Sequence, residues 1–305
     1  LLKQKSSNDH LIHSIFPRTI AKELIRKTEE DAEENASFNA KFTHLRSAGL
    51  TFALVHEQIS ILFTDIVGFT AMSKAVEPYQ VLKFLDELYS EFDAIIDTNP
   101  NLWKVETIGD SFMAAGGLEV SAQMRSLSVR LASRSHSDCS GSGSVTRQET
   151  RIDTDKLKVS KSVELARISY SEPSHTPAAS KRDYGEESLR NGELCEDPAI
   201  NALYVLMFAT RIVEASEACL MPNGIQCRVR CGIHTGNVCS GIVGTRMPRY
   251  TLFGDTVNTA SRMESTSEPG RVQVSCATHE LLTQNFEHIE WEDRGEIQVK
   301  GKGRM

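Results

Sequence analysis

Two aspartates each follow an apolar stretch of the chain. Asp65 ends the run in ILFTDIVGFT, residues 61–70, and Asp110 lies at the turn of KVETIGDSFMAAGG, residues 104–117. In a βαββ unit the first strand and the following hairpin are neighbours in the sheet, so we expect the two carboxylates to meet. They would repel unless a cation lay between them, and Mg²⁺ or Mn²⁺ takes oxygen ligands of this kind. The pair predicts a divalent metal site, whereas either Asp alone also fits a turn cap or an exposed strand end.

A second polar group lies in GDTVNTASRMES, residues 254–265. Asn258 and Arg262 are four residues apart, so on a helix that begins near Asp255 they share one face. An amide and a guanidinium on one face can hold a sugar oxygen and a phosphate oxygen. Arg230 in VRCGIHTG and Lys300 in VKGKG are two further cations suited to phosphates. Each of these residues, taken alone, also fits an exposed polar surface.

The elements that must position these residues form an α+β plan. We expect a strand at 59–65, a helix after Pro78, a strand pair at 102–117, a helix at 199–215, a strand hairpin at 228–244 and a helix from near Asp255. Apolar residues that repeat every three or four positions predict the first helix: Val81, Leu82, Leu85, Leu88, Phe92 and Ile95. Residues 120–197 are rich in Ser, Arg, Thr and Glu without sustained periodicity, which predicts an insertion or disordered loop.

Composition argues against several classes of protein. The net charge of -7 over 305 residues gives no reason to expect nucleic acid or an anionic membrane as a partner. Seven cysteines without a CxxC pair predict neither a disulfide framework nor a zinc site, and they fit a reducing, cytosolic setting. The longest mainly apolar run, residues 200–213, is interrupted and too short to span a bilayer. Because the chain begins at Leu1 and stops abruptly, we expect a piece of a longer parent chain.

Five motifs together resemble the catalytic domain of class III nucleotidyl cyclases, and most closely that of eukaryotic, receptor-type guanylyl cyclases. They are FTDIVGFT, KVETIGDSFM, RCGIHTGNV, RYTLFGDTVNTASRMES and VKGKG, which keep the family's order and spacing outside the insertion. The resemblance implies a ferredoxin-like fold whose catalytic parts, 50–118 and 198–305, flank a long disordered insertion at 119–197. Residues 1–49 would be a helical linker or dimerisation segment.

The resemblance also implies a two-metal reaction. Asp65, Asp110 and the backbone carbonyl of Ile66 would hold two Mg²⁺ or Mn²⁺ ions in each active site. The ions would promote in-line attack of the ribose 3′-hydroxyl on the α-phosphate and stabilise the departing pyrophosphate. Asp65, water and the substrate itself all stay open as the general base.

The remaining motif residues would contact the nucleotide. By resemblance, Asn258 and Arg262 orient the ribose and stabilise the transition state, and Arg230 and Lys300 hold the terminal phosphates. Active sites in this family are shared between two chains of a head-to-tail dimer. Because this chain carries both the metal acids and the Asn/Arg pair, a homodimer could form two complete sites.

The choice of purine falls on Glu106 and Thr251 by resemblance. Glu106 can accept from the N1–H and 2-amino groups of guanine, whereas adenylyl cyclases typically have Lys at this position. Thr251 departs from both patterns, since guanylyl cyclases usually have Cys there and adenylyl cyclases Asp. A hydroxyl can donate to guanine or accept from adenine and discriminates little. Glu106 therefore decides the prediction of GTP as substrate.

Two other functions stay open from the sequence. One is an adenylyl or dual-specificity cyclase, favoured if Thr251 outweighs Glu106. The other is a non-catalytic cyclase-homology module that regulates or dimerises, although such a module would be expected to lose a metal Asp or the Asn/Arg pair. We expect a cytoplasmic catalytic domain whose only membrane contact is through missing parts of the parent chain.

Overall fold

The computed structural model describes residues 53–118, 163–167, 197–243 and 249–304, together with Pro17 and Ala21. The strands are β1 Ala53–Ile66, β2 Leu102–Ile108, β3 Ser111–Gly116, β4 Val163–Arg167, β5 Val229–Val243, β6 Arg249–Phe253, β7 Val272–Ser275, β8 Glu290–Asp293, β9 Gln298–Val299 and β10 Gly303–Arg304. The helices are α4 Phe69–Ala75, α5 Pro78–Ile96, α7 Pro198–Glu217, α8 Asp255–Ser265 and α9 Cys276–Asn285.

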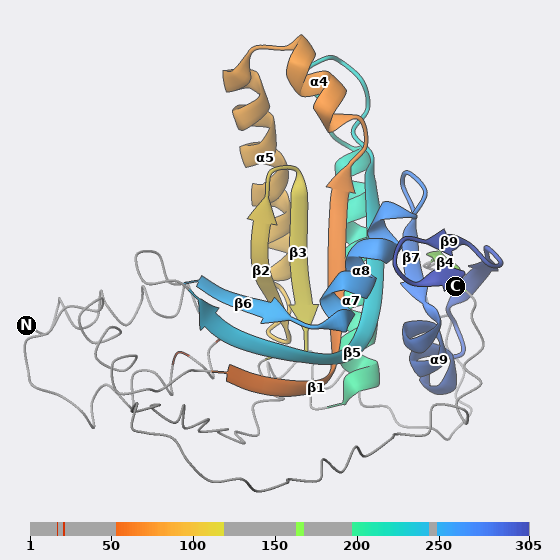
Figure 1. Cartoon of the computed structure of the whole chain (residues 1–305). Coiled ribbons are helices and arrows are strands. Elements are labelled where there is room, and N and C mark those ends of the chain that lie inside the picture. Colours follow the sequence, from red (N-terminus) through yellow and green to blue (C-terminus); the bar gives the residue numbers. More distant parts are fainter. Residues whose placement is uncertain are drawn as a thin grey trace, which may run out of the picture.

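The main sheet has the order β2-β3-β1-β5-β7-β4-β8, with β6 paired to β5 (Figure 1). Strand β1 is antiparallel to both β3 and β5, and β5 is parallel to β7. The succession β1-α5-β2-β3-α7-β5 is the βαββαβ plan of ferredoxin-like folds. The α+β architecture expected from the sequence is thus confirmed.

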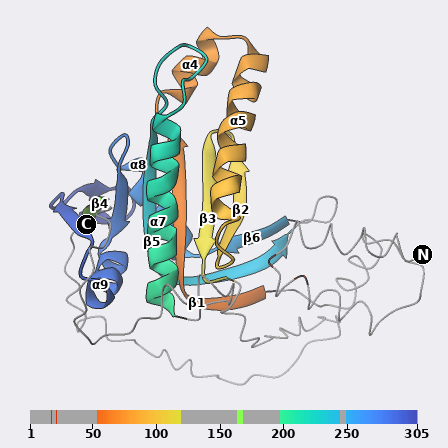
Figure 2. The ribbon, with the colours of Figure 1, turned by 180° about the vertical axis from the view of Figure 1, so that it is seen from behind.

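Helices cover the two faces of the sheet unequally. Helices α5 and α7 lie along one face, seen from behind in Figure 2, and the short α8 lies on the other. Alternation along β1 supplies both cores, because successive side chains of a strand point to opposite faces. Leu62 and Ile66 join the α5/α7 core, and Ile59 and Ile61 join the smaller core that includes Ala260 of α8.

Helix α5 begins and faces the core for local reasons. Pro78 occupies its first turn, and Glu77 and Gln80 form a reciprocal capping box. The helix buries the stripe Val81, Phe84, Leu88, Phe92 and Ile96. The predicted helix is confirmed, but its apolar face is rotated, since Leu82 is 69% exposed and Phe84 is buried in its place.

The hairpin predicted at 228–244 is wrong. Residues 229–243 form one continuous strand, β5, and its hairpin partner is β6. Two glycines of β5 let α8 approach the strand closely. A Cβ built on Gly232 would lie 1.9 Å from the backbone nitrogen of Glu264, and one on Gly236 would lie 2.7 Å from the hydroxyl of Thr256. Glycine at these positions serves helix–sheet packing.

The insertion predicted at 119–197 departs from expectation at five residues. Within residues 119–196 the structure describes only 163–167, which form β4 between β7 and β8. The N-terminal segment predicted at 1–49 lies outside the described residues except at Pro17 and Ala21. Among the described helices, α7 alone is long and apolar enough to cross a bilayer, but 67% of its apolar window is buried inside the structure. Its apolar residues are core residues here.

Candidate active site

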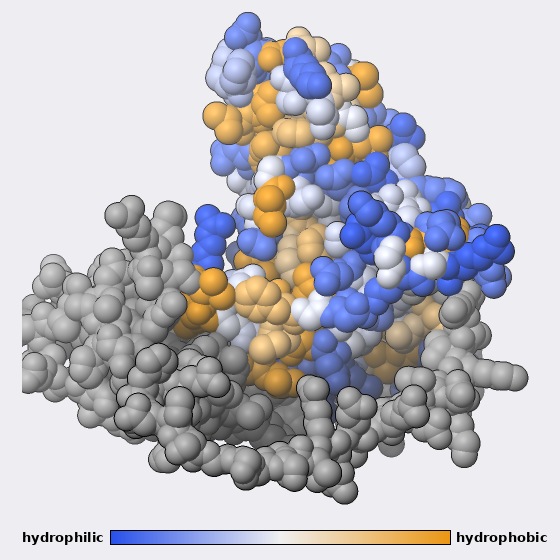
Figure 3. All heavy atoms as spheres, in the orientation of Figure 1, coloured by the Kyte–Doolittle hydropathy of each residue, from blue (hydrophilic) through white to orange (hydrophobic). Residues whose placement is uncertain are grey.

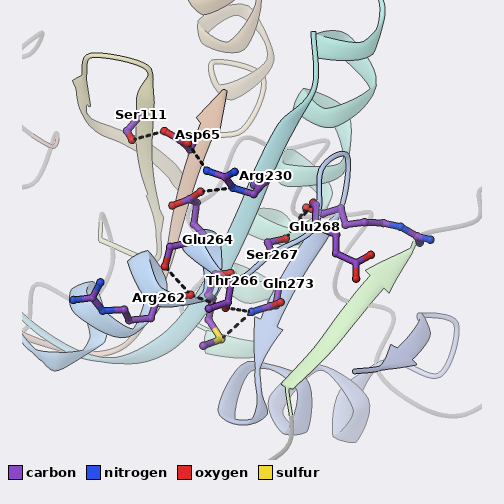
Figure 4. Close-up of polar contacts among 12 residues, drawn as sticks. Asp65, Ser111, Arg230, Arg262, Glu264, Thr266, Ser267, Glu268 and Gln273 are labelled. Carbon is purple, nitrogen blue, oxygen red and sulfur yellow. Dashed lines mark hydrogen bonds and ion pairs between the residues drawn. The ribbon is translucent and has the colours of Figure 1, made fainter. Parts of the chain in front are cut away.

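Asp65 lies in a row of polar side chains that crosses three strands. In the sheet register it is opposite Ser111 of β3 on one side and Arg230 of β5 on the other. Directly opposed residues of antiparallel strands point to the same face, so the three side chains meet. Ser111 Oγ donates to Asp65 Oδ1 at 3.4 Å, and Arg230 Nη2 donates to Asp65 Oδ2 at 2.5 Å (Figure 4).

Glu264 of α8, which was not predicted as a site residue, completes this row. Arg230 Nε donates to Glu264 Oε1 at 3.0 Å, so one guanidinium bridges two carboxylates. Glu264 is 9% exposed. Burial, the largest effect, raises the pKa of its carboxyl, and the hydrogen bond from Arg230 opposes that rise. The signal available in the sequence was an acid inside an otherwise buried helix face, but its partner is 34 residues away.

Asp110 lies at the tip of the β2–β3 hairpin and is brought to Asp65, as predicted. Burial, followed by the negative charge of Asp65, raises the pKa of Asp110 to about 6. Gly109 takes a φ of 63°, which favours glycine at this turn. The Tyr89 hydroxyl of α5 donates to the Gly109 carbonyl at 3.1 Å and anchors the tip.

The donor set suits a hard divalent cation. Burial and the negative charge of Asp65 raise the pKa of both Asp110 and Glu264, and Arg230 opposes both rises. Across the described ranges, however, no group of three or more His, Cys, Asp or Glu side chains is arranged to hold a metal ion. Two carboxylates would therefore need further oxygen ligands from the backbone, water or substrate. Ile66, whose carbonyl was predicted as a ligand, directly follows Asp65 at the end of β1.

The predicted nucleotide-binding residues of α8 lie apart from the acids. Asn258 is exposed, and the Arg262 side chain points away from the Asp65–Arg230 pair (Figure 4). Lys302 forms an ion pair with Asp255 at the first turn of the helix, so the VKGKG loop with Lys300 lies at that end. Asp255 and Glu264 are about 14 Å apart at 1.5 Å of rise per residue. The two ends of α8 thus carry different parts of the predicted site.

The two predicted base-contacting residues, Glu106 and Thr251, lie on β2 and β6, which are not paired in the sheet but contact each other. A register irregularity between Lys104 and Glu106 leaves Glu106 opposite Met113, whose side chain belongs to the core on the α8 face. Glu106 therefore faces the same side of the sheet as Asp65. Thr251 of β6 is opposite Gly241 of β5, and β6 approaches β2 across this face (Figure 1).

Comparison with known proteins identifies the family. The model of the adenylate and guanylate cyclase catalytic domain matches residues 53–140 and 191–305, leaving a gap inside the predicted insertion. The chain is 32% identical over 304 residues to the atrial natriuretic peptide receptor 2 of Anguilla japonica, covering 100% of this chain and 20% of that receptor. It is 28% identical over 307 residues to a receptor-type guanylate cyclase of Caenorhabditis elegans, with the same coverage. The chain thus spans 20% of the length of these relatives.

A solved structure agrees on the fold. The guanylate cyclase domain of RhGC from Catenaria anguillulae, in complex with GTP, superposes with a TM-score of 0.50 at 24% identity, covering 83% of this chain and 94% of that one. At this identity the likeness concerns the fold alone. Sheet order, motifs and the family match all agree, and this chain belongs to the adenylate and guanylate cyclase catalytic domain family.

Proposed function

We propose that the domain is a guanylyl cyclase that converts GTP to 3′,5′-cyclic GMP and pyrophosphate at sites shared by two copies in a head-to-tail homodimer. The observation that carries this proposal is that the motif residues of one chain lie too far apart, and point in too many directions, to meet at one site. Asp65 lies near the last turn of α8 through Arg230, Lys302 pairs with Asp255 at the first turn, and Arg262 points away from Asp65. A second copy, related by a twofold axis, would bring its own α8 to the acids of the first.

The α8 face of the sheet offers a surface for that second copy. Phe63, Trp103 and Val105 are only partly buried on this face, and Ile108 at the hairpin tip is 60% exposed. Figure 3 shows apolar side chains gathered between the β2–β3 hairpin and α8. Apolar surface of this kind favours association with another protein surface.

In the proposed mechanism Asp65, Asp110 and the Ile66 carbonyl supply oxygen ligands for two divalent cations. When bound, these cations would lower the pKa of the ribose 3′-hydroxyl and stabilise charge on the α-phosphate and pyrophosphate. Asn258 of the second copy would orient the ribose, and Arg262 of that copy would donate to the oxygens that gain charge in the transition state. These donors are already placed on a packed helix, which limits the reorganisation that the reaction requires.

Two residues are candidates to contact the terminal phosphates: Lys300, which is exposed, and Arg230, which is already paired with carboxylates. Lys300 is exposed in the loop after β9 and could reach a phosphate without breaking a described contact. Arg230 would have to exchange Asp65 for a phosphate oxygen. We therefore assign the stronger phosphate role to Lys300.

We infer GTP as the preferred substrate from Glu106. A carboxylate accepts the two donors on the guanine edge and repels the N1 acceptor of adenine. Thr251 adds little selectivity, so cyclic AMP as a minor product is compatible with the site. Because the relatives named above include a much longer receptor, we also infer that the domain is the cytoplasmic part of a larger, membrane-anchored parent.

The first experiment measures turnover by the purified protein with Mn²⁺ and equal GTP and ATP, with chromatographic separation of the cyclic products. We expect cyclic GMP to predominate and to vanish in Asp65→Ala. Predominant cyclic AMP would make the domain an adenylyl cyclase. No product from either nucleotide would favour a non-catalytic module.

A mixing experiment tests the shared site. Asp65→Ala and Asn258→Ala should each be inactive alone, whereas a re-equilibrated mixture contains heterodimers with one intact site. Random pairing predicts recovery of about a quarter of wild-type activity. Mixing Asp65→Ala with Asp110→Ala is the matched control and should recover nothing, since both changes fall in the same half-site. Equal lack of recovery in both mixtures would contradict the shared site.

A further inference from the structure

Arg230 is placed between two carboxylates that come from different elements. Its Nη2 lies 2.5 Å from Asp65 Oδ2 and its Nε lies 3.0 Å from Glu264 Oε1. The exposed fractions of the Arg230, Asp65 and Glu264 side chains are 28%, 24% and 11%. Partly buried charge pairs are screened less by solvent and salt than pairs on the surface. Removal of one carboxylate should therefore change the interactions of Arg230 with the other.

The position of Glu264 is fixed by the backbone. Gly232 of β5 allows the backbone of α8 to lie directly against the strand at Met263 and Glu264. Arg230 precedes Gly232 by two residues and therefore points to the same face of the sheet. The Glu264 carboxylate is thus held beside Arg230 by a helix–strand contact that leaves little room for adjustment.

A divalent cation and Arg230 would compete for the same carboxylate. Asp65 is the residue that we propose as a metal ligand, yet its Oδ2 accepts the Arg230 hydrogen bond. An arginine left without any anion in a half-buried place would oppose metal binding, because its charge would lose compensation. Glu264 removes that penalty, since it can keep the guanidinium when Asp65 turns to a cation.

We propose that Arg230 is the resident counter-ion of Asp65, and that Glu264 retains Arg230 when a divalent cation takes Asp65. Both are positioning residues, and the proposal rests on the proposed metal-binding role of Asp65. It gives Arg230 a role other than the phosphate contact that its motif suggested. It also makes opposite predictions for the two residues, which a purely structural ion pair would not.

The test is Mn²⁺ binding without nucleotide, followed by the electron paramagnetic resonance signal of free Mn²⁺. Glu264→Gln should weaken binding on the order of tenfold, because Arg230 then depends on Asp65 alone. Arg230→Gln should strengthen it, because the competing cation is gone. Glu268→Gln is the matched control: it also removes one negative charge near the end of α8, but Glu268 pairs with Arg294 at 3.2 Å. It should leave Mn²⁺ affinity unchanged.

The double variant decides between mechanisms. If Glu264 acts through Arg230, Glu264→Gln should have no effect on Mn²⁺ affinity in the Arg230→Gln background. An equal weakening in both backgrounds would overturn the proposal, since Glu264 would then attract the ion by its own charge. Unchanged Mn²⁺ affinity in the single variants would also overturn it. So would Mn²⁺ binding that persists in Asp65→Ala, or the absence of any Mn²⁺ binding by the wild type.

Two further measurements separate the proposed role of Arg230 from a general effect of its charge and from misfolding. Arg230→Lys keeps the charge without the fork that reaches both carboxylates, so it should weaken Mn²⁺ binding as Glu264→Gln does. Thermal unfolding of each variant identifies any that fail to fold. Turnover is measured separately: Mn²⁺ binding with the expected pattern but no cyclic product would refute the proposed function and leave this inference standing.

Discussion

Replacement of Gly232 by alanine should separate α8 from β5. The added Cβ would lie 1.9 Å from Glu264 N, 2.4 Å from Met263 C and 2.5 Å from Glu264 Cα, all of them backbone atoms. Backbone cannot rotate aside as a side chain can, so the helix itself must retreat. Ordinary contact begins at 3.4 Å, which requires a retreat of about 1.5 Å.

Two consequences follow from this retreat. Overpacking against backbone should cost about 3 kcal/mol of unfolding free energy, at the upper end of what inserted methyl groups cost. For a domain of this size that is a fall in Tm of about 6–12 °C. The Arg230–Glu264 distance, 3.0 Å in the structure, would open toward about 4.5 Å, beyond hydrogen-bonding range. Turnover should fall sharply, because α8 also carries Asn258 and Arg262.

The assay is thermal and urea unfolding of the purified domain, with cyclase turnover measured at a temperature where the variant is folded. Gly236→Ala is the matched control in the same strand. Its Cβ would meet the side-chain hydroxyl of Thr256 at 2.7 Å, and a side chain can shift more easily than a helix backbone. We expect a smaller loss of stability there. A Gly232→Ala protein with wild-type Tm and turnover would refute the packing argument.

Three shorter predictions test other parts of the site and core. Tyr89→Phe removes the hydrogen bond to the Gly109 carbonyl and should cost about 1 kcal/mol of unfolding free energy. It should also weaken Mn²⁺ binding, because Asp110 next to Gly109 becomes more mobile. Unchanged Mn²⁺ affinity in a titration would argue against this anchoring role. Burial lowers the pKa of His56 from 6.5 to about 4, so the folded state resists its protonation and stability falls as the pH drops below 6.5. Because burial also lowers the pKa of His234 to about 4, His56 is measured by difference: by pH 5 the wild type should lose about 2 kcal/mol more than His56→Gln in urea unfolding. Glu106→Lys presents a donor to the base and should shift the product ratio from cyclic GMP toward cyclic AMP; an unchanged ratio by chromatography would show that the selector lies elsewhere.

Local sequence patterns predicted the elements of the fold well where one cause dominates. Helix α5 has a proline in its first turn and apolar residues that recur every three or four positions, so its presence and its beginning after Pro78 were predicted. Strand β5 was predicted as a hairpin, although residues 229–243 form one continuous strand. Its Gly232 admits the backbone of α8, and that partner cannot be recognised from neighbouring residues alone. Its apolar stretch therefore gave the strand but not its continuity.

The candidate site was predictable as a set of residues but not as an arrangement. The βαββ order implied that Asp65 and Asp110 would meet, and the register places them at one end of the sheet. The pairing of Arg230 with Asp65 and Glu264 was not predictable, because it requires the register of β1 against β5 and the closeness of α8. The resemblance to the family predicted a phosphate contact for Arg230. In the structure its Nε and Nη2 donate to the carboxylates of Glu264 and Asp65.

Helix α8 connects two sites if the proposed dimer is correct. Asn258 and Arg262 would serve the site built on the acids of the second copy, while Glu264 holds Arg230 at the acids of its own chain. The helix packs on Gly232 too tightly for one face to move without the other. A change at Asp65 in one site would thus be felt, through Arg230 and Glu264, by the transition-state donors of the other. Communication between the two sites needs no element beyond this helix and the strand beneath it.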